Sequence, residues 1–400
     1  MAKRSVLLGV VAGSVMFGGS ALASTAQDAM VPPEATFMYG LPYASLGSDG
    51  PYVESGAIYN DAPVYTKAGP GGLTWSLYRR ADGRWYVDFN DVSEDWDGTI
   101  ASTSKAQAFP WSTSAWAKGL VSFRTQQVYV GGIPYPQMGS TGDYVFSGRI
   151  HNSAPVYTKA GPGGSTWSLY KRTDGRWYVD FNDVSDDWNG TVAHTSQAAA
   201  WPWQASWNGS TAFALITKTV YLYGTAYSNL GSEGEWELSG AVYGGRPVYQ
   251  RLVAGTPWSL YRRADGRWYV DFNDISDDWD GTLASAASAS SWPWEASWSG
   301  DVLCFHQDSV TAAGAPYSTL GSAGTYLFAG TIHGGAPVYE RQSDSLTWWL
   351  YRRADGRWYV DFNDVSEDWD GTITSTNSAA SRPWSGTWKG ATTVSQNLDE

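Results

Sequence analysis

An eight-residue string recurs four times along the chain and constrains the fold more than any other feature. Arg-Trp-Tyr-Val-Asp-Phe-Asn-Asp begins at Arg84, Arg176, Arg267 and Arg357, at spacings of 92, 91 and 90 residues. A repeating unit of this length is about twice a propeller blade and is long enough for a small core of its own. Of the 24 Trp residues, 20 fall in five columns of four, so the aromatic content belongs to the repeat. We therefore expect an all-β protein of four tandem homologous antiparallel β-modules, each of about 90 residues and closely packed.

The flanking pattern sets the expected boundaries of these modules. Pro-Val-Tyr and Trp-x-Leu-Tyr precede each string, with Leu-Gly-Ser before them in three of the four repeats, and an acidic loop, Gly-Thr and Pro-Trp follow it. The connectors, such as 120–123 and 213–216, are apolar and strand-like rather than Pro/Ser-rich, so neighbouring modules are expected to pack or to share sheet edges. The predicted segments are an N-terminal segment at 24–35, modules at 36–120, 121–212, 213–302 and 303–390, and a C-terminal tail at 391–400.

The first residues are typical of an export signal. Lys3 and Arg4 precede an apolar stretch from Val6 to Phe17, and Ala21-Leu22-Ala23 resembles a cleavage site. We expect a signal peptide at 1–23 and a secreted, extracellular protein, with the lumen of an organelle as the open alternative. The apolar stretch is too short to span a membrane, and no later run is longer, so no membrane span is expected. The single Cys rules out an intrachain disulfide.

One hairpin can be predicted in register. Two strand-like runs, Trp75–Arg80 and Arg84–Phe89, flank the residues 81–83. A two-residue turn would place the apolar side chains on opposite faces. A three-residue loop pairs Arg80 with Arg84 and places Gly83 where a left-handed residue is needed. Because a slip of one residue reverses every side chain, the hydrophobic pattern selects the second register. Trp75, Leu77, Trp85, Val87 and Phe89 then share one face, and Ser76, Tyr78, Tyr86 and Asp88 share the other.

The second face of this hairpin is the first candidate binding surface. Planar rings beside polar groups suit sugars, and exposed aromatic patches commonly mark interaction sites. The alternative is that this face is covered by another part of the protein. Trp96, which lies between acidic residues, is the Trp that we expect to reach solvent. The predicted ligand-binding residues are Tyr78, Tyr86, Asp88 and Trp96; Tyr170, Tyr178, Asp180 and Trp188; Tyr261, Tyr269, Asp271 and Trp279; and Tyr351, Tyr359, Asp361 and Trp369.

The acidic loop after each hairpin is the second candidate site. Several carboxylates within ten residues repel one another unless a cation or hydrogen bonds compensate. Calcium accepts six to eight oxygen ligands from irregular loops, although the spacing here does not match an EF-hand. The alternative is that Arg79, Arg80 and Arg84 pair with the acids. No cofactor is required, and the predicted calcium ligands are Asp91, Asp95 and Asp97; Asp183, Asp187 and Asn189; Asp274, Asp278 and Asp280; and Asp364, Asp368 and Asp370.

Composition and repetition argue against two classes of protein. The net charge of −13 would repel a phosphate backbone, so no nucleic-acid partner is expected. None of the four His recurs in all modules, so no repeated triad base or His-metal site is present in the sequence. The lone Cys304 lies in an apolar run, as a buried side chain would. Because four near-identical copies contain no distinct catalytic copy, we expect a protein that is not an enzyme.

The pattern as a whole resembles a family of exported proteins. Ser-Gly-Ala-Ile-Tyr, Pro-Val-Tyr, Leu-Tyr-Arg-Arg, Asp-Gly-Arg-Trp-Tyr-Val and the closing Pro-Trp resemble tandem Trp/Gly-rich β-modules of exported proteins from algae, aquatic protists and invertebrates. The likeness covers nearly all of the chain after the signal peptide. It implies an extracellular, non-enzymatic role and transfers no catalytic residue.

Together these features lead to one functional expectation and one alternative. We expect an exported, lectin-like protein that binds glycan or polysaccharide through several weak sites, because avidity raises the affinity for a ligand that also repeats. The alternative is a structural matrix, coat or biomineral-associated protein that self-associates through its β-repeats.

Overall fold

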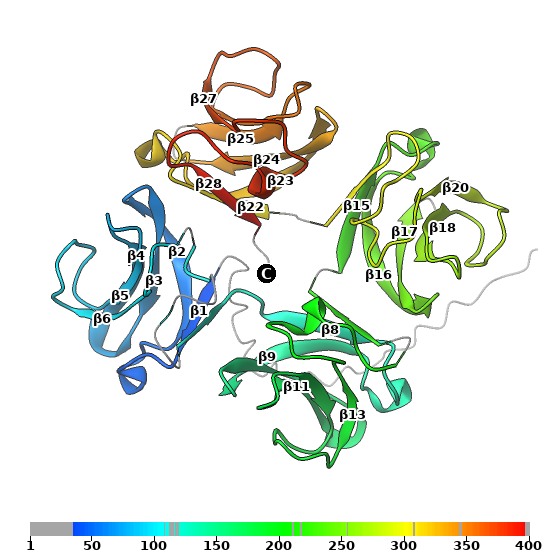
Figure 1. Cartoon of the computed structure of the whole chain (residues 1–400), viewed down its shortest axis with the longest axis horizontal. Helices are drawn as coiled ribbons and strands as arrows, with labels where there is room; N and C mark the ends of the chain where they lie inside the picture. Colours follow the sequence, from blue (N-terminus) through cyan, green and yellow to red (C-terminus); the bar gives the residue numbers. More distant parts are fainter. Residues whose placement is uncertain are drawn as a thin grey trace, which may run out of the picture. The chain divides into compact units, whose positions relative to one another are not determined.

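A computed structural model describes residues 35–107, 109–111, 116, 120–209, 212–216, 218–253, 255–306, 309–343 and 346–396. The predicted signal peptide at 1–23 and all but residue 35 of the predicted segment at 24–35 lie outside the described residues. The chain is all-β, with four antiparallel seven-stranded sheets (Figure 1). Each sheet takes all its strands from one repeat, so the four-module prediction is confirmed.

Every sheet has the same strand order. In module 1 the order is β6-β5-β4-β3-β2-β1-β7, which is a meander with its last strand returned beside the first. The strands of module 1 are β1 (Thr36–Tyr39), β2 (Gly50–Tyr59), β3 (Ala62–Ala68), β4 (Thr74–Arg79), β5 (Trp85–Asp88), β6 (Thr99–Ser102) and β7 (Val121–Phe123). Those of module 2 are β8 (Gln127–Gly131), β9 (Gly142–His151), β10 (Ala154–Ala160), β11 (Thr166–Lys171), β12 (Trp177–Asp180), β13 (Thr191–His194) and β14 (Phe213–Leu215).

Modules 3 and 4 repeat this order. Module 3 contains β15 (Thr219–Tyr223), β16 (Gly234–Tyr243), β17 (Arg246–Val253), β18 (Thr256–Arg262), β19 (Trp268–Asp271), β20 (Thr282–Ser285) and β21 (Leu303–Phe305). Module 4 contains β22 (Ser309–Ala313), β23 (Gly324–His333), β24 (Ala336–Gln342), β25 (Thr347–Arg352), β26 (Trp358–Asp361), β27 (Thr372–Ser375) and β28 (Thr393–Gln396). The helices are single 3₁₀ turns: η1 (Ala44–Leu46), η2 (Pro70–Gly72), η3 (Pro136–Met138), η4 (Pro162–Gly164), η5 (Pro202–Gln204), η6 (Ser228–Leu230), η7 (Ser318–Leu320) and η8 (Pro383–Ser385).

The predicted hairpin register is confirmed. Tyr78 pairs with Tyr86, and the amide of Arg80 donates to the carbonyl of Arg84 at 3.0 Å. The loop therefore has three residues, and Gly83 takes the left-handed conformation with φ of 77°. The same register recurs between β11 and β12, β18 and β19, and β25 and β26.

The first face of this hairpin forms the core of each module. Trp75, Leu77, Trp85 and Val87 are buried in one cluster, together with the Trp of the closing segment. Phe89 lies on the same face, but its ring is 42% exposed and packs edge-on against Trp75 at the rim. Burial of such rings is the largest favourable contribution that a chain without disulfides can gain, because each removes about 150–250 Å² from water.

The last strand of each sheet corrects the predicted boundaries. Residues 121–123 were assigned to the second repeat, yet β7 pairs with β1 and completes the first sheet. Likewise β14 and β21 complete the second and third sheets, and β28, in the predicted tail, completes the fourth. The strands of the modules therefore span 36–123, 127–215, 219–305 and 309–396. The connectors are strands, as predicted, but each belongs to the module before it.

Within the described residues, no helix has both the length and the apolar character that a bilayer crossing requires.

Candidate functional site

The acidic loop of each module folds back over the second face of the hairpin. In module 1 this loop joins β5 to β6, and the carbonyl of Ser93 accepts hydrogen bonds from the Tyr78 hydroxyl and from Nε of Arg80, at 3.1 and 2.8 Å. The second face is therefore interior. The predicted exposure of Tyr78, Tyr86 and Asp88 is wrong, because their side chains are 0–1% exposed. The same correction applies to Tyr170, Tyr178, Asp180, Tyr261, Tyr269, Asp271, Tyr351, Tyr359 and Asp361.

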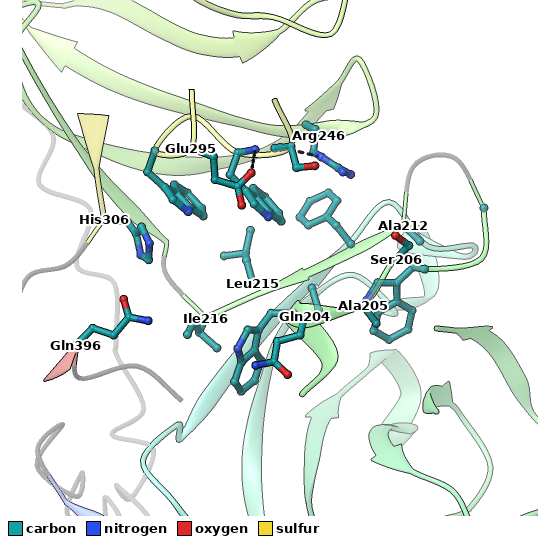
Figure 2. Close-up of a pocket in the computed structure, with 18 residues that line it drawn as sticks. Gln204, Ala205, Ser206, Ala212, Leu215, Ile216, Arg246, Glu295, His306 and Gln396 are labelled. Atoms are coloured by element: carbon teal, nitrogen blue, oxygen red, sulfur yellow. Dashed lines mark hydrogen bonds between the residues drawn. The ribbon is translucent and has the colours of Figure 1, made fainter. Parts of the chain in front are cut away.

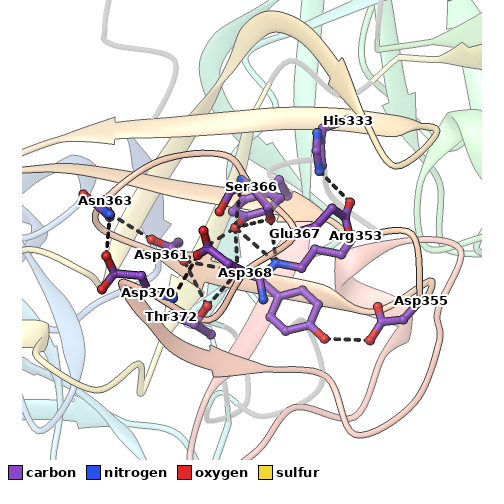
Figure 3. A network of polar contacts seen from close by, with 12 residues as sticks. His333, Arg353, Asp355, Asp361, Asn363, Ser366, Glu367, Asp368, Asp370 and Thr372 are labelled. Carbon is purple, nitrogen blue, oxygen red and sulfur yellow. Dashed lines mark hydrogen bonds and ion pairs between the residues drawn. The ribbon is translucent and has the colours of Figure 1, made fainter.

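A buried arginine organises the polar groups beneath the loop. Nη2 of Arg80 donates to Oγ1 of Thr99 at 2.6 Å and lies 3.5 Å from Oδ2 of Asp88. Thr99 in turn donates to Asp88 at 3.0 Å. Figure 3 shows the equivalent network in module 4, where Arg353 contacts Asp361, Thr372 and the carbonyl of Ser366. The corresponding pairs in modules 2 and 3 are Arg172–Asp180 at 3.3 Å and Arg263–Asp271 at 3.2 Å.

These contacts have a structural rather than a chemical character. Burial raises the pKa of the Tyr78 hydroxyl, so the hydroxyl stays protonated and donates to Ser93. The buried carboxylate of Asp88 accepts a hydrogen bond from the hydroxyl of Thr99 and another, at 2.9 Å, from the backbone amide of Asn90. The equivalent carboxylates of the other modules have the same two kinds of donor. A charge that is paired and hydrogen-bonded in this way holds the loop in place. The alternative that Arg80 pairs with an acid is thereby supported.

A second ring of polar contacts holds the hairpin loop. The Tyr86 hydroxyl and Nε of Arg84 both donate to Oδ2 of Asp82, each at 2.6 Å. Burial alone would raise the pKa of Asp82, but these hydrogen bonds outweigh burial and lower it from its ordinary value. In module 4, burial and the hydrogen bond to Asp355 raise the pKa of Tyr359 to about 12 (Figure 3).

One indole in each acidic loop projects into solvent. Trp96 is 62% exposed, and its ring meets the Tyr86 ring edge-on at 5.4 Å. The guanidinium of Arg80 lies 4.0 Å from the centre of the Tyr86 ring and 5.3 Å from that of Trp96. We call each exposed indole, with the Tyr and Arg beneath it, a tryptophan platform. The four platforms are built on Trp96, Trp188, Trp279 and Trp369, which are 62, 61, 62 and 61% exposed.

The four platforms differ at their edges. In module 2 the ring of His194 stacks on Tyr178 at 5.4 Å and meets Trp188 edge-on at 5.3 Å. In module 4 the ammonium group of Lys389 lies 5.7 Å from the centre of the Trp369 ring. The sequence repeats the platform but varies what surrounds it.

The predicted calcium ligands are exposed and take part in local hydrogen bonds. Oδ1 of Asp95 accepts from the amide of Asp97 at 2.9 Å, and Oδ2 of Asp97 accepts from Asn90 at 3.1 Å. Among the described residues, no group of three or more His, Cys, Asp or Glu side chains is placed to hold a metal ion. Calcium binding stays a prediction. Its other predicted ligands, all exposed, are Asp91, Asp183, Asp187, Asn189, Asp274, Asp278, Asp280, Asp364, Asp368 and Asp370.

A second exposed cluster of side chains was not predicted from the sequence. Tyr43 begins the turn η1 in the left-handed conformation with φ of 66°, and its side chain is 55% exposed. Leu46 follows it, and the carbonyl of Leu46 accepts from the indole of Trp75, on which Phe89 packs. We call Tyr43, Leu46 and Phe89 the tyrosine-turn patch. Its signal was the recurring Tyr-x-x-(Leu/Met)-Gly-Ser, which gives the counterparts Tyr135, Met138 and Phe181; Tyr227, Leu230 and Phe272; and Tyr317, Leu320 and Phe362.

A pocket of about 630 Å³ is lined by Leu215, Arg246, Glu295 and His306, among other side chains (Figure 2). In module 3, Nε of Arg246 donates to the carbonyl of Ser291 at 3.0 Å, and the amide of Trp292 donates to Glu295 at 3.2 Å. Arg246 also lies 5.3 Å from the centre of the Trp292 ring. Arg246 and Glu295 each therefore form a hydrogen bond with the backbone of the closing segment of module 3.

No family model and no curated protein matches this chain.

Proposed function

We propose that this chain is an exported multivalent binding protein, lectin-like, that recognises glycan or polysaccharide through its four tryptophan platforms. The observation that carries the proposal is that Trp96 and its three counterparts are each about three-fifths exposed at the same position of a repeated module. A rigid, solvent-facing indole is costly to hold in water and offers a flat surface to the C–H face of a sugar ring.

The platform is held in place before any ligand arrives. The loop that carries Trp96 is fixed by Arg80, Asp88 and Thr99, and the ring rests on Tyr86. A ligand that stacks on the indole therefore causes little loss of side-chain freedom, which favours binding. Four such surfaces on one chain raise the affinity for a repeating polymer without any new contact.

In this proposal the exposed Trp96 contacts the sugar, and the buried Tyr78 and Tyr86 do not. Tyr86 supports the platform from below, and Tyr78 and Asp88 hold the loop. Export is part of the proposal, and it rests on the sequence of residues 1–23. An enzymatic role is not part of it, because the repeated polar groups are occupied with one another.

A glycan array with the purified chain tests the proposal. The variant that carries Ala at Trp96, Trp188, Trp279 and Trp369 is expected to lose sugar-specific binding while its far-ultraviolet circular dichroism is unchanged. Trp349→Ser is the matched control, because Trp349 stands where the other three modules have Ser76, Ser168 and Ser259. Failure of the unmodified chain to bind any glycan, or equal binding by the fourfold variant, would contradict the proposal.

The tyrosine-turn patch favours a second candidate, the self-associating matrix or coat protein. Tyr43 and its counterparts have φ of 61–67°, a conformation that costs a bulky residue on the order of 1–3 kcal/mol. Gly adopts this conformation freely, so fourfold Tyr→Gly variants keep the turn and remove the ring. If the patch joins chains, light scattering detects concentration-dependent assemblies of the unmodified chain that the Tyr→Gly variant does not form. A monomeric chain at all concentrations would rule out this second candidate.

A further inference from the structure

The solvent-facing side of each tryptophan platform is strongly acidic. The segment 89–98 and its three counterparts contain no Lys or Arg, while they hold 15 of the chain's 39 acidic residues, all exposed. Two cations lie near the indole of module 1: Arg80 is 3% exposed beneath the rings, and Arg84, which is 6.0 Å from the centre of the Trp96 ring, is paired with Asp82 at 2.6 Å. A ligand that approaches the indole therefore meets negative charge, which repels sulfated or carboxylated glycans and attracts cationic ones.

Module 4 carries a cation of its own on the platform. Lys389 is held by a hydrogen bond from its amide to the carbonyl of Ser375 at 3.0 Å, and its ammonium group lies 5.7 Å from the centre of the Trp369 ring. The same backbone bond occurs in module 2, from Asn208 to His194 at 2.8 Å, and in module 3, from Ser299 to Ser285 at 3.1 Å. Of the three modules whose residue at this position the structure describes, module 4 alone places a Lys or Arg there.

We infer that the tryptophan platforms bind a polysaccharide whose sugars carry free amino groups, and that Lys389 occupies the amine position in module 4. This inference rests on the proposed function and names the ligand class of the same site. The sugar ring stacks on the indole, and its ammonium group takes the place that Lys389 fills in module 4, 5.7 Å from the centre of the indole ring. Module 3, which has Ser299 there and no His194 equivalent, provides an open platform.

The ligand class follows from two properties that one molecule must combine. The indole offers a flat apolar surface, and the loop offers exposed carboxylates such as Asp95 and Asp97. A free hexosamine presents a C–H face and an ammonium group on the same ring. A polymer of such sugars also matches the repetition of the platforms along the chain.

The test is to titrate the full chain with saccharide trimers at pH 6, where aliphatic amines are protonated. Binding is detected through the indole N–H signals in nuclear magnetic resonance spectra. The four exposed indoles are assigned with single Trp→Phe variants. Glucosamine trimer is expected to shift the signal of Trp279 at about five- to tenfold lower concentration than N-acetylglucosamine trimer, and 0.5 M NaCl is expected to remove the difference. The Trp369 signal is expected to respond only in Lys389→Ser, and Lys389→Arg is the control that keeps a cation on the ring.

Each outcome decides a separate point. Equal response to the acetylated and free trimers, or no effect of salt, would overturn the amino-sugar inference and leave the proposed function standing. A stronger response to trilysine than to glucosamine trimer would overturn the choice of a sugar in favour of a basic peptide. If Trp369 responds in the unmodified chain as Trp279 does, Lys389 does not occupy the site. If no saccharide shifts any of the four indoles, the proposed function fails as well.

Discussion

Arg80 and Thr99 are joined by a hydrogen bond of 2.6 Å although 19 residues separate them in the chain. Arg80 follows strand β4, and Thr99 begins strand β6, so this bond closes the acidic loop across its base. The same bond measures 2.6, 2.7 and 2.7 Å in modules 2, 3 and 4, from Arg172, Arg263 and Arg353. The loop that presents the exposed indole is therefore a fixed part of each module.

Arg80→Leu is expected to destabilise module 1 severely. The substitution leaves the carboxylate of Asp88, which is fully buried, without its cation, and breaking a buried pair in this way costs about 3–5 kcal/mol. Urea denaturation followed by tryptophan fluorescence measures the loss. Arg84→Leu is the matched control, because Arg84 and Asp82 form a solvent-accessible pair, and water screens such a pair so that its removal costs far less than the loss of a buried pair. Similar losses in the two variants would contradict the structural role of Arg80.

Gly98→Ala tests whether the loop closes as tightly as the structure indicates. Gly98 has φ of 82°, and a Cβ atom there would collide with Oδ1 of Asp88. Gly71 also has a positive φ, of 68°, but a Cβ atom there meets open space. Gly71→Ala is expected to cost about 1 kcal/mol through backbone strain alone, and Gly98→Ala at least 1 kcal/mol more. Melting temperatures compare the two, and equal shifts would mean that the loop has room to move.

Asp82→Asn is expected to have a pH-dependent cost. Because the pKa of Asp82 is lowered in the folded protein, the stabilisation is present above the ordinary value near 3.8 and is lost as the pH falls through the folded-state value. The variant should be less stable by about 1 kcal/mol at pH 7, through weaker bonds from Tyr86 and Arg84, and the difference should shrink as the pH falls below 3.8. Urea denaturation at pH 7 and at a pH below 3.8 measures the difference in the free energy of unfolding. Asp91→Asn, at an exposed carboxylate, is the control. A cost that is independent of pH would argue against a charged Asp82.

Calcium binding by the acidic loops is tested by calorimetry. A cation that binds only the folded loops raises the melting temperature, and at a hundredfold excess over its dissociation constant it adds about 2.7 kcal/mol. The rise is expected with millimolar calcium and should be reversed by a chelator. Replacing Asp91, Asp95 and Asp97 by Asn, in module 1 and equivalently elsewhere, should abolish it. If calcium leaves the melting temperature of the unmodified chain unchanged, the loops do not bind it.

Local rules were enough to predict the hairpin. The alternation of Trp75, Leu77, Trp85 and Val87, with Gly83 at the third loop position, allowed only the register in which Arg80 meets Arg84. The exposure of Trp96 was also predicted, because it lies among charged residues in a loop. In both cases the deciding interactions join residues that are close in the sequence.

The sequence by itself determined the number of modules, their all-β class and the faces of each hairpin, since repetition and two-residue alternation are properties of neighbouring residues. Only the tertiary structure decided that the face with Tyr78, Tyr86 and Asp88 is interior. Alternation separates two faces of a strand but does not say which is covered, and here a loop held by Arg80 covers the second one. The boundaries were decided in the same way, because β7 pairs with β1 from the opposite end of the module, and no local pattern encodes such a distant pairing.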